Sequence, residues 1–395
     1  MHWNNRGDEA ANRALIEKLK ADYPELEIYV QLLAMEHKGI EDLELQKIVF
    51  LKSLFPRRRN LIEYFLMYIS KGKIYYSKAG KEFIQIMKEA EVIVHCPGGP
   101  AIGDIYKKVE RPYLERLLLA LRMNKKIMFY APSMGPFNNK KNRILQKLIL
   151  KKANSIVFRE EISGKYLQKL DSKINYSVSV DTAFLNKSSI EENEKLLMED
   201  IVLKEFLDTH DKIIGITITD LQWNPLYQNN EEIRKKINDT FHEFIKILTS
   251  KGYAIMFIPQ LFGEENDYNY MKQFVINNCI VLNDIYNCNF QQYIISKLYA
   301  VVGMRYHSNI FSCKMGTPFI SISYEQKMKG FMNIADLSEW CIELNELEVN
   351  VLIRKIEKIE EQYSEYKERL SQISKLMTRR ADITYKKLKD VIESD

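Results

Sequence analysis

The chain has 395 residues, of which 46% are hydrophobic and 28% charged, and its formal net charge is only +5. This length suits two domains with cores of their own, and the mild, dispersed charge does not indicate a nucleic-acid-binding protein. The five cysteines show neither metal-ligand nor disulfide spacing, which indicates reduced thiols and a cytoplasmic protein. No secretory leader opens the sequence and no run of about 18 apolar residues occurs, so no membrane-spanning segment is expected.

The first 190 residues alternate short apolar runs with helical periods. Residues 4–11 predict a loop that opens a helix extending to Leu19, although the strand that should feed this loop is absent from the sequence. Apolar runs predict strands at residues 28–33, 92–95, 127–130, 155–158 and 176–180, with helices at 112–123 and 142–153 between them. This alternation is typical of an α/β domain with a parallel sheet.

An insert at about residues 36–78 interrupts the alternation. It contains Pro56-Arg57-Arg58-Arg59, followed by an apolar and aromatic run over residues 61–69. Basic residues beside an amphipathic helix suit contact with an anionic membrane surface. The alternative is an ordinary solvated helix end.

The alternation restarts after a charged segment at residues 186–211, which predicts a second domain over residues 211–345. Strands are expected at 212–218, 253–258, 280–282, 299–302 and 318–322, and helices at 231–251, 266–277 and 289–297. Residues 346–395 are charged and helical, and we expect them to pack back on the first domain; a solvated coiled coil is the alternative. The predicted fold is two Rossmann-like domains with parallel sheets.

The densest polar chemistry follows two apolar runs of the second domain. Arg305 and His307 come directly after residues 299–302, and Tyr324 and Lys327 follow the next run. The carboxyl ends of neighbouring parallel strands meet at one edge of a sheet, where ligands bind. Arg and Lys bind carboxylate or phosphate, and His transfers protons near neutral pH. The pattern predicts a site for a small, multiply anionic substrate; the alternative is a capping Arg and a His that only packs.

Four motifs of the first domain also follow apolar runs. A glycine-rich loop contains Gly98 and Gly99 and ends at Asp104, and paired glycines allow backbone N–H groups to approach an anion. The other three motifs contain Ser133 (residues 131–137), Arg159 (159–163) and Asp181 (180–184). The alternatives are ordinary turns for the loops with Gly98 and Ser133, an ion pair at a helix start for Arg159, and an Asp-capped turn for Asp181.

Taken in order, these motifs resemble the polysaccharide pyruvyl transferase family. The matches are a GGG-x-x-GD-like loop at residues 98–104, a P-x-x-x-GP-like segment at 132–136, R-(D/E)-x-x-S at 159–163, (P/V)-D-x-A-F at 180–184 and G-x-R-x-H…G-x-P…Y-x-x-K from 303 to 327. The N-N-x-GD-E-A start at residues 4–10 is also similar. Two departures are that Pro100 replaces the third glycine, which removes one N–H from a possible anion cradle, and that the 132–136 segment is one residue shorter.

The resemblance implies a glycosyltransferase-B-like fold with the active site in the cleft between the domains. It also implies transfer of pyruvate from phosphoenolpyruvate to a sugar, as a ketal on two hydroxyls, with release of phosphate. The acceptor would be a sugar of a cell-surface glycan or of its lipid-linked oligosaccharide precursor, and the enzyme would be cytoplasmic, at the inner face of the membrane if it contacts lipid. No resident cofactor is implied, and the cationic cluster lacks the grouped carboxylates that would hold a divalent metal.

The expected roles fall into three groups. His307 and Asp104 are the expected catalytic pair, with His307 as general acid and Asp104 as base, or with the roles exchanged. The expected donor-binding residues are Arg305, Arg159, Lys327, Gly98, Gly99 and Ser133. The expected residues of the acceptor site or cleft are Asn5, Asp8, Asp181 and Tyr324.

Two other functions are compatible with the same pattern. A nucleotide-sugar-dependent glycosyltransferase of similar architecture would need contacts for a base and a ribose, which the sequence does not identify. A non-catalytic binding homologue would bind the donor without releasing phosphate.

Overall fold

The structure is a computed structural model that describes residues 3–32, 40, 43, 45, 47–50, 59–98, 102–105, 107–262 and 266–394. The chain divides into two compact units. The first contains Leu15–Thr182 and the chain from Arg380 onward, and the second contains Asn4–Ala14 and Ala183–Arg379. Residues 4–14, which the sequence placed in the first domain, therefore belong to the second unit, whereas Trp3 belongs to the first. No helix among the described residues is long and apolar enough to cross a membrane.

The first unit contains a four-stranded parallel sheet in the order β3-β4-β5-β6. Its strands are β3 (Val92–His95), β4 (Lys126–Tyr130), β5 (Ser155–Phe158) and β6 (Ser177–Val178). A separate parallel pair consists of β1 (Tyr29–Leu32) and β2 (Lys47–Phe50). The helices are α2 (Arg59–Ile69), α3 (Lys78–Glu89), α4 (Lys107–Arg122), α5 (Arg143–Lys152) and α6 (Glu161–Leu170). The predicted strands at 92–95 and 155–158 match β3 and β5 residue for residue.

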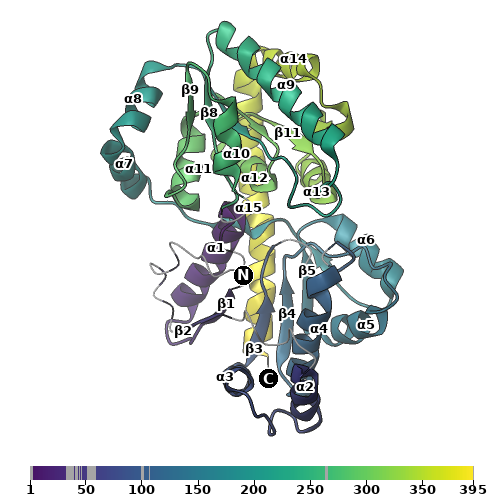
Figure 1. Cartoon of the computed structure of the whole chain (residues 1–395). Helices are drawn as coiled ribbons and strands as arrows, with labels where there is room; N and C mark the ends of the chain where they lie inside the picture. The colour runs from purple at the N-terminus through teal and green to yellow at the C-terminus, as the bar shows by residue number, and fades with distance from the viewer. Residues whose placement is uncertain are drawn as a thin grey trace. The chain divides into compact units, whose positions relative to one another are not determined.

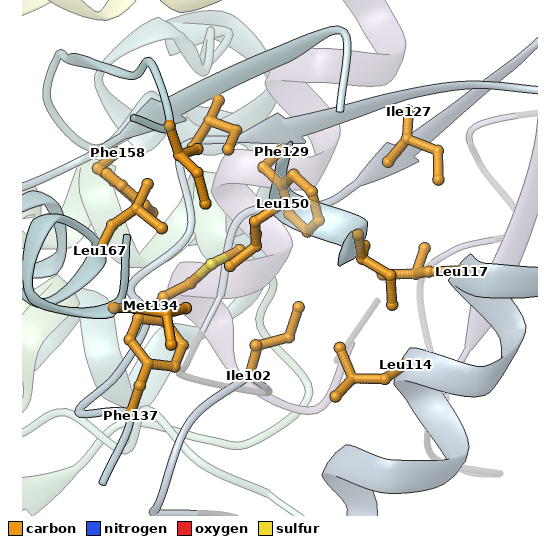
Figure 2. Packing of buried hydrophobic residues seen from close by; sticks show 14 of the residues in the cluster. Ile102, Leu114, Leu117, Ile127, Phe129, Met134, Phe137, Leu150, Phe158 and Leu167 are labelled. Carbon is orange, nitrogen blue, oxygen red and sulfur yellow. The ribbon is translucent and has the colours of Figure 1, made fainter. Parts of the chain in front are cut away.

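The core of this unit forms where the inward side chains of the strands meet α4, α5 and α6. Phe129 and Phe158 come from β4 and β5, and Leu167 comes from α6. Ile102 and Met134 come from the loops after β3 and β4 and are completely buried in the same cluster (Figure 2). The two loops that carry predicted site residues are therefore anchored by apolar side chains.

The second unit contains a six-stranded parallel sheet in the order β9-β8-β7-β10-β11-β12, of which β8, β9 and β11 are labelled in Figure 1. Its strands are β7 (Ile213–Thr217), β8 (Ala254–Phe257), β9 (Cys279–Val281), β10 (Ala300–Gly303), β11 (Phe319–Ser323) and β12 (Cys341–Glu343). The chain runs outward from β7 to β9, then returns to pair β10 with β7 and runs outward in the other direction. The reversal between β7 and β10 is the topological switch point at which sheets of this kind bind ligands.

Eight helices, counted among the described residues, lie wholly in the second unit: α7 (Ile190–Glu199), α8 (Ile201–Thr209), α9 (Glu231–Ser250), α10 (Asp267–Met271), α11 (Cys288–Lys297), α12 (Tyr306–Met315), α13 (Gln326–Ile334) and α14 (Val349–Glu361). Helix α10 is shorter than the helix predicted at 266–277, because a 3₁₀ turn (Lys272–Phe274) replaces its second half. Helix α12 is buried from Tyr306 to Cys313 and ends at Gly316, whose φ of 72° suits glycine. Helix α12 is thus part of the core of the second unit, and this packing fixes the position of its first residues.

Two helices have residues in both units. Helix α1 (Arg6–Asp22) belongs to the second unit up to Ala14, and the 31-residue α15 (Tyr363–Glu393) enters the first unit at Arg380. Within the first unit, the Ser179 hydroxyl donates to the Arg380 carbonyl and Tyr385 donates to the Lys18 carbonyl. The expected return of the carboxyl-terminal helices to the first domain is confirmed for this end of α15.

Candidate active site

The turn from β10 into α12 is fastened to the neighbouring strand β7. The backbone N–H groups of Met304 and Arg305 both lie within hydrogen-bonding distance of the Thr217 hydroxyl, at 3.1 and 3.2 Å. The same hydroxyl lies 2.8 Å from that of Ser308, which donates to the Arg305 carbonyl. Thr217 is the last residue of β7, so the switch point itself fixes the backbone that presents Arg305 and His307.

Arg305 is buried and pairs with Asp267 at the start of α10. Its Nε lies 3.0 Å from Oδ2 of Asp267, and its Nη2 bonds Oδ1. Asp267 Oδ2 also accepts the backbone N–H groups of Gln260 and Leu261. Burial alone would lower the pKa of Arg305, but the Asp267 carboxylate outweighs it and raises that pKa above its ordinary value. Arg305 is therefore a permanent cation with two of its nitrogens committed to a neighbouring acid.

Aromatic side chains complete the surroundings of Arg305. The guanidinium carbon stands 5.0 Å from the ring centroid of Trp223, and Tyr324 also forms a hydrogen bond with Arg305. Trp223 meets Tyr324 edge to face, with centroids 6.0 Å apart. A third aromatic, Tyr227, donates to the Tyr324 carbonyl at 3.0 Å. The loop after β7 thus binds the segment after β11, and the two enclose Arg305.

Lys327 lies beside the same turn. Its Nζ is 2.8 Å from Oε2 of Glu325, and 5.8 Å from the ring centroid of Tyr306, the residue between Arg305 and His307. Asn224 donates to the other oxygen of Glu325 at 2.6 Å. Of the residues that the sequence singled out, the structure therefore brings Arg305 into contact with Tyr324 and places Lys327 beside Tyr306.

His307 lies directly against the first turn of α1. A Cβ atom built on Gly7 would stand 1.7 Å from Cγ of His307, so only glycine fits at this position. The Asn5 side chain accepts the N–H groups of Gly7 and Asp8, at 3.0 and 3.3 Å, and so caps the helix. Asn5 also pairs with Leu261 in an isolated bridge. The predicted residues Asn5 and Asp8 therefore belong to the same locality as His307.

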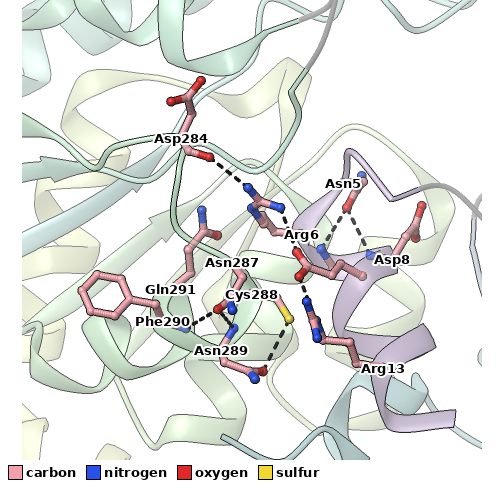
Figure 3. Close-up of polar contacts among 12 residues, drawn as sticks. Asn5, Arg6, Asp8, Arg13, Asp284, Asn287, Cys288, Asn289, Phe290 and Gln291 are labelled. Carbon is pink, nitrogen blue, oxygen red and sulfur yellow. Dashed lines mark hydrogen bonds and ion pairs between the residues drawn. The ribbon is translucent and has the colours of Figure 1, made fainter. Parts of the chain in front are cut away.

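A buried charge cluster on α1 was not predicted. Glu9 accepts from Arg6 Nη1 and from Arg13 Nε, both at 2.9 Å, and all three side chains are buried. Figure 3 labels the two arginines. Arg6 also donates to the Asp284 carbonyl at 2.9 Å and lies over the Phe262 ring. Two arginines share one carboxylate, so the cluster carries a net positive charge at the base of the α1 turn that contacts His307.

In the first unit, Arg159 links three of the other predicted motifs. Its Nε donates to the Ser133 hydroxyl at 2.9 Å, its Nη1 to Asp181 at 2.7 Å and its Nη2 to the Gly98 carbonyl at 3.0 Å. These partners follow β4, β6 and β3, whereas Arg159 follows β5. The guanidinium therefore holds together the loops at the carboxyl edge of the whole sheet. Gly99 lies outside the described residues.

Asp104 occupies a different position in the first unit. Its Oδ2 accepts the N–H of Asn138 at 2.6 Å and its Oδ1 that of Asn139 at 3.0 Å. Next to it, Gly103 approaches Gly135 so closely that a Cβ would stand 2.7 Å from the Gly135 backbone. Both oxygens of Asp104 thus cap the loop after β4. His307 belongs to the second unit.

Three of these residues, Asp267, Trp223 and Arg6, were not predicted from the sequence. Trp223 follows the strand β7, so the strand-end rule that identified the other motifs could have found it. Asp267 follows β8 by ten residues, and no local pattern distinguishes it from other helix-starting acids. Among the described residues, no group of three or more His, Cys, Asp or Glu side chains is placed to hold a metal ion.

The chain is similar over its full length to proteins of several kinds. It is 21% identical over 390 residues to the amylovoran biosynthesis protein AmsJ of Erwinia amylovora, covering 93% of this chain and 92% of that protein. In fold it is similar to a putative UDP-N-acetylglucosamine 2-epimerase from Listeria monocytogenes, with a TM-score of 0.62, 12% identity and coverage of 100% of this chain and 96% of the other.

Two further solved structures share the architecture. A UDP-GlcNAc 2-epimerase from Neisseria meningitidis has a TM-score of 0.59 at 9% identity, with 98% of each chain covered. A UDP-glucosyltransferase from Polygonum tinctorium has a TM-score of 0.55 at 11% identity, with 98% of this chain and 96% of the other covered. At these identities the likeness shows the fold alone, which is glycosyltransferase-B-like.

The family model that matches is the one described as polysaccharide pyruvyl transferase, and it covers residues 5–326. That span contains the Asn5 cap, the Arg159 hub and the turn with Arg305 and His307, and it ends one residue before Lys327. The chain therefore belongs to the polysaccharide pyruvyl transferase family.

Proposed function

We propose that this protein transfers pyruvate from phosphoenolpyruvate to a sugar, as a ketal on two hydroxyls, with release of phosphate. The observation that carries the proposal is that Arg305, His307 and Lys327 all follow the carboxyl ends of the neighbouring strands β10 and β11, in a chain of this family. Phosphoenolpyruvate has a carboxylate and a phosphate, which require cationic partners. Its methylene carbon requires a proton, which a histidine can supply.

The proposed reaction uses few groups. His307 donates a proton to the methylene carbon, directly or through the donor phosphate, and the neighbouring carbon becomes electrophilic. One sugar hydroxyl attacks that carbon, a second hydroxyl does the same, and the bond from the carbon to the phosphate oxygen breaks. Two C–O bonds form and one breaks. One of the two hydroxyl protons replaces the proton that His307 donated, and the other leaves with phosphate or solvent. Asp104 is the proposed acceptor of a hydroxyl proton.

The donor contacts are proposed with the observed ion pairs in view. Arg305 commits Nε and Nη2 to Asp267, so the proposed contact with the donor uses Nη1. Lys327 is a compact cation on a flexible stem and can bind a phosphate while it keeps Glu325 close. Arg159 forms hydrogen bonds with Ser133, Asp181 and Gly98. A donor anion that binds Arg159 therefore binds beside these three partners.

The proposed acceptor is a sugar of an exopolysaccharide or of its lipid-linked oligosaccharide precursor. The family description and the amylovoran protein of Erwinia amylovora support this class of acceptor. The proposal places the reaction in the cytoplasm, in keeping with five free cysteines. It includes neither a metal nor a resident cofactor, since the cationic side chains supply the charge that the donor needs.

Mass spectrometry of candidate acceptors incubated with phosphoenolpyruvate and the full chain tests the proposal. The expected result is a pyruvate-ketal adduct formed together with phosphate, and its loss by a factor of about 10²–10⁴ in His307→Ala. Turnover of a nucleotide sugar with none of phosphoenolpyruvate would overturn the proposal in favour of a glycosyltransferase. Tight binding of phosphoenolpyruvate without phosphate release would show a non-catalytic homologue.

A further inference from the structure

Helix α2 presents an apolar face to solvent. Leu61, Ile62, Phe65 and Ile69 are each between 49% and 64% exposed. At 100° per residue these four positions fall within about 100° of the helix circumference, so they form one continuous stripe. We call these four residues the α2 apolar face. Single exposed apolar residues are ordinary, but a stripe of four on one helix marks an interaction surface.

The opposite side of α2 packs against other helices of the first unit. Met67 is completely buried in a cluster with Phe83, Ile84 and Leu119, which come from α3 and α4. Tyr64 donates to the Glu115 carbonyl at 3.0 Å. Helix α2 lies beside α4 in Figure 1. Its inward side is fixed by this packing, so the helix cannot rotate to bury the α2 apolar face without losing its own core contacts.

Glu63, the acidic residue of α2, accepts hydrogen bonds from the loop that follows the helix. Glu63 is buried, and one of its oxygens accepts the N–H groups of Tyr76 and Ser77, at 2.8 and 2.6 Å. Burial opposes ionisation of Glu63, but these hydrogen bonds outweigh it and hold its pKa below the ordinary value. The loop held in this way exposes two further apolar side chains, Ile74 and Tyr76.

The segment that carries the stripe is basic in sequence. Residues 57–81 contain seven Arg or Lys and a single acid, Glu63, which is buried. Exposed lysines lie at positions 71, 73, 78 and 81. Arg57 and Arg58 are outside the described residues and are not part of the proposed surface. The whole chain has a net charge of only +5, so the rest of the protein is nearly balanced and the excess charge belongs to this segment.

We propose that the α2 apolar face and its cationic neighbours dock the protein on a bilayer surface that contains anionic lipid. An apolar stripe enters the boundary between headgroups and acyl chains, while the exposed lysines bind anionic headgroups. Helix α2 has 11 residues, or about 16 Å at 1.5 Å per residue, so it is too short to cross about 30 Å of hydrocarbon and lies in the interface instead.

The charge favours this occupant over a second copy of the chain. A twofold dimer through this face would bring the same patch of each copy together, and therefore lysine against lysine. An anionic lipid surface meets the same patch with opposite charge. Docking of this kind does not depend on the proposed function, although it would place the protein where lipid-linked sugars are found.

Flotation of the full chain with vesicles tests the proposal. We expect binding to vesicles of phosphatidylcholine with phosphatidylglycerol, weaker binding in high salt, and little binding to phosphatidylcholine alone. Phe65→Ser with Ile62→Ser should lower the bound fraction at least about tenfold, and so should Lys71→Glu with Lys73→Glu, each in protein with unchanged circular dichroism.

The matched control is an equally exposed apolar pair in an acidic setting. Ile201 and Val202 of α8 are 74% and 68% exposed and follow Glu199 and Asp200. Ile201→Ser with Val202→Ser should leave vesicle binding unchanged. Failure of the native chain to float with anionic vesicles would overturn the proposal, as would undiminished binding of the Phe65 variant. Self-association abolished by the Phe65 variant, without vesicle binding, would assign the face to a second copy. Flotation needs no turnover, so this result is separate from that of the proposed reaction.

Discussion

Gly7 and His307 are in contact across 300 residues of sequence. The first turn of α1 lies so close to the imidazole that a Cβ on Gly7 would stand 1.7 Å from Cγ, 1.8 Å from Nδ1 and 2.2 Å from Cβ of His307. The φ of Gly7 lies outside the left-handed region, so close approach alone requires glycine here. The first turn of α1 therefore limits where the His307 side chain can lie.

Gly7→Ala should displace the imidazole and lower turnover while the protein stays folded. Over-packing of this kind typically costs about 1–3 kcal/mol of stability. The measurement is kcat per folded molecule, read beside thermal melting. Gly164→Ala is the matched control, since its Cβ would meet the Tyr176 ring at 2.3 Å in the first unit. It should lose stability and keep kcat. A Gly7→Ala protein with normal kcat would show that the position of His307 does not matter to the reaction.

Arg305→Ala should weaken the use of phosphoenolpyruvate by at least about tenfold, because a charge-assisted contact contributes about 1.5–3 kcal/mol. The change also leaves Asp267 buried without its partner, which costs about 3–5 kcal/mol of stability. Arg305→Lys keeps a charge without the planar fork and gives a second, milder variant. Steady-state kinetics with varied donor concentration provide the measurement.

Asp267→Asn is the control for that experiment. It breaks the same ion pair and should lower the melting temperature, but it keeps Arg305 and should leave KM for phosphoenolpyruvate near the native value. Donor kinetics that are unchanged in folded Arg305→Ala would assign Arg305 to structure alone.

Asp104→Asn separates catalysis from loop capping. Asparagine keeps one oxygen that can accept the N–H of Asn138 or Asn139, so the loop loses part of its cap. If Asp104 accepts the hydroxyl proton, turnover should fall by about 10²–10⁴ with a small change in melting. Asp104→Ala removes both acceptors and should in addition lower the melting temperature. Turnover that follows only the folded fraction in both variants would remove Asp104 from the chemistry.

The stability of the first unit should depend on His95 in acid. Burial lowers the pKa of His95 to about 3, from an ordinary value of 6.5. Between these values the unfolded chain binds a proton that the folded chain does not, so stability rises with pH across this window and is lost as pH falls through it. One such group contributes at most about 1.4 kcal/mol per pH unit.

Urea unfolding from pH 7 to pH 4 checks this prediction. His95→Gln should flatten the pH dependence relative to the native protein. Tyr113→Phe is the control. It removes the hydroxyl that forms a hydrogen bond with Nδ1 of His95, while the His95 imidazole stays buried. Since burial is the main cause, this variant should retain the pH dependence. An equal slope in His95→Gln and in the native protein would refute the assignment.

The sequence by itself determined the elements and the edge of the sheet at which polar side chains gather. The apolar runs at 92–95 and 155–158 are β3 and β5, because side-chain periodicity is a local property that the chain displays directly. The position of Arg305, His307, Tyr324 and Lys327 after two such runs also predicted the edge of the sheet that they share, since parallel neighbours end at the same edge. The family motifs added the chemistry expected there.

Only the tertiary structure decided which partners those side chains have. Asp267 lies 38 residues before Arg305, and Gly7 lies 300 residues before His307, and no local pattern links either pair. The strand order β9-β8-β7-β10-β11-β12 creates the first contact, because it places the ends of β8 and β10 on either side of β7. The second contact depends on α1, which the Asn5–Leu261 bridge joins to the segment after β8. Arg159 likewise became a structural hub only when four strands brought Gly98, Ser133 and Asp181 around it. Such contacts depend on how distant segments pack, which a local sequence pattern does not encode.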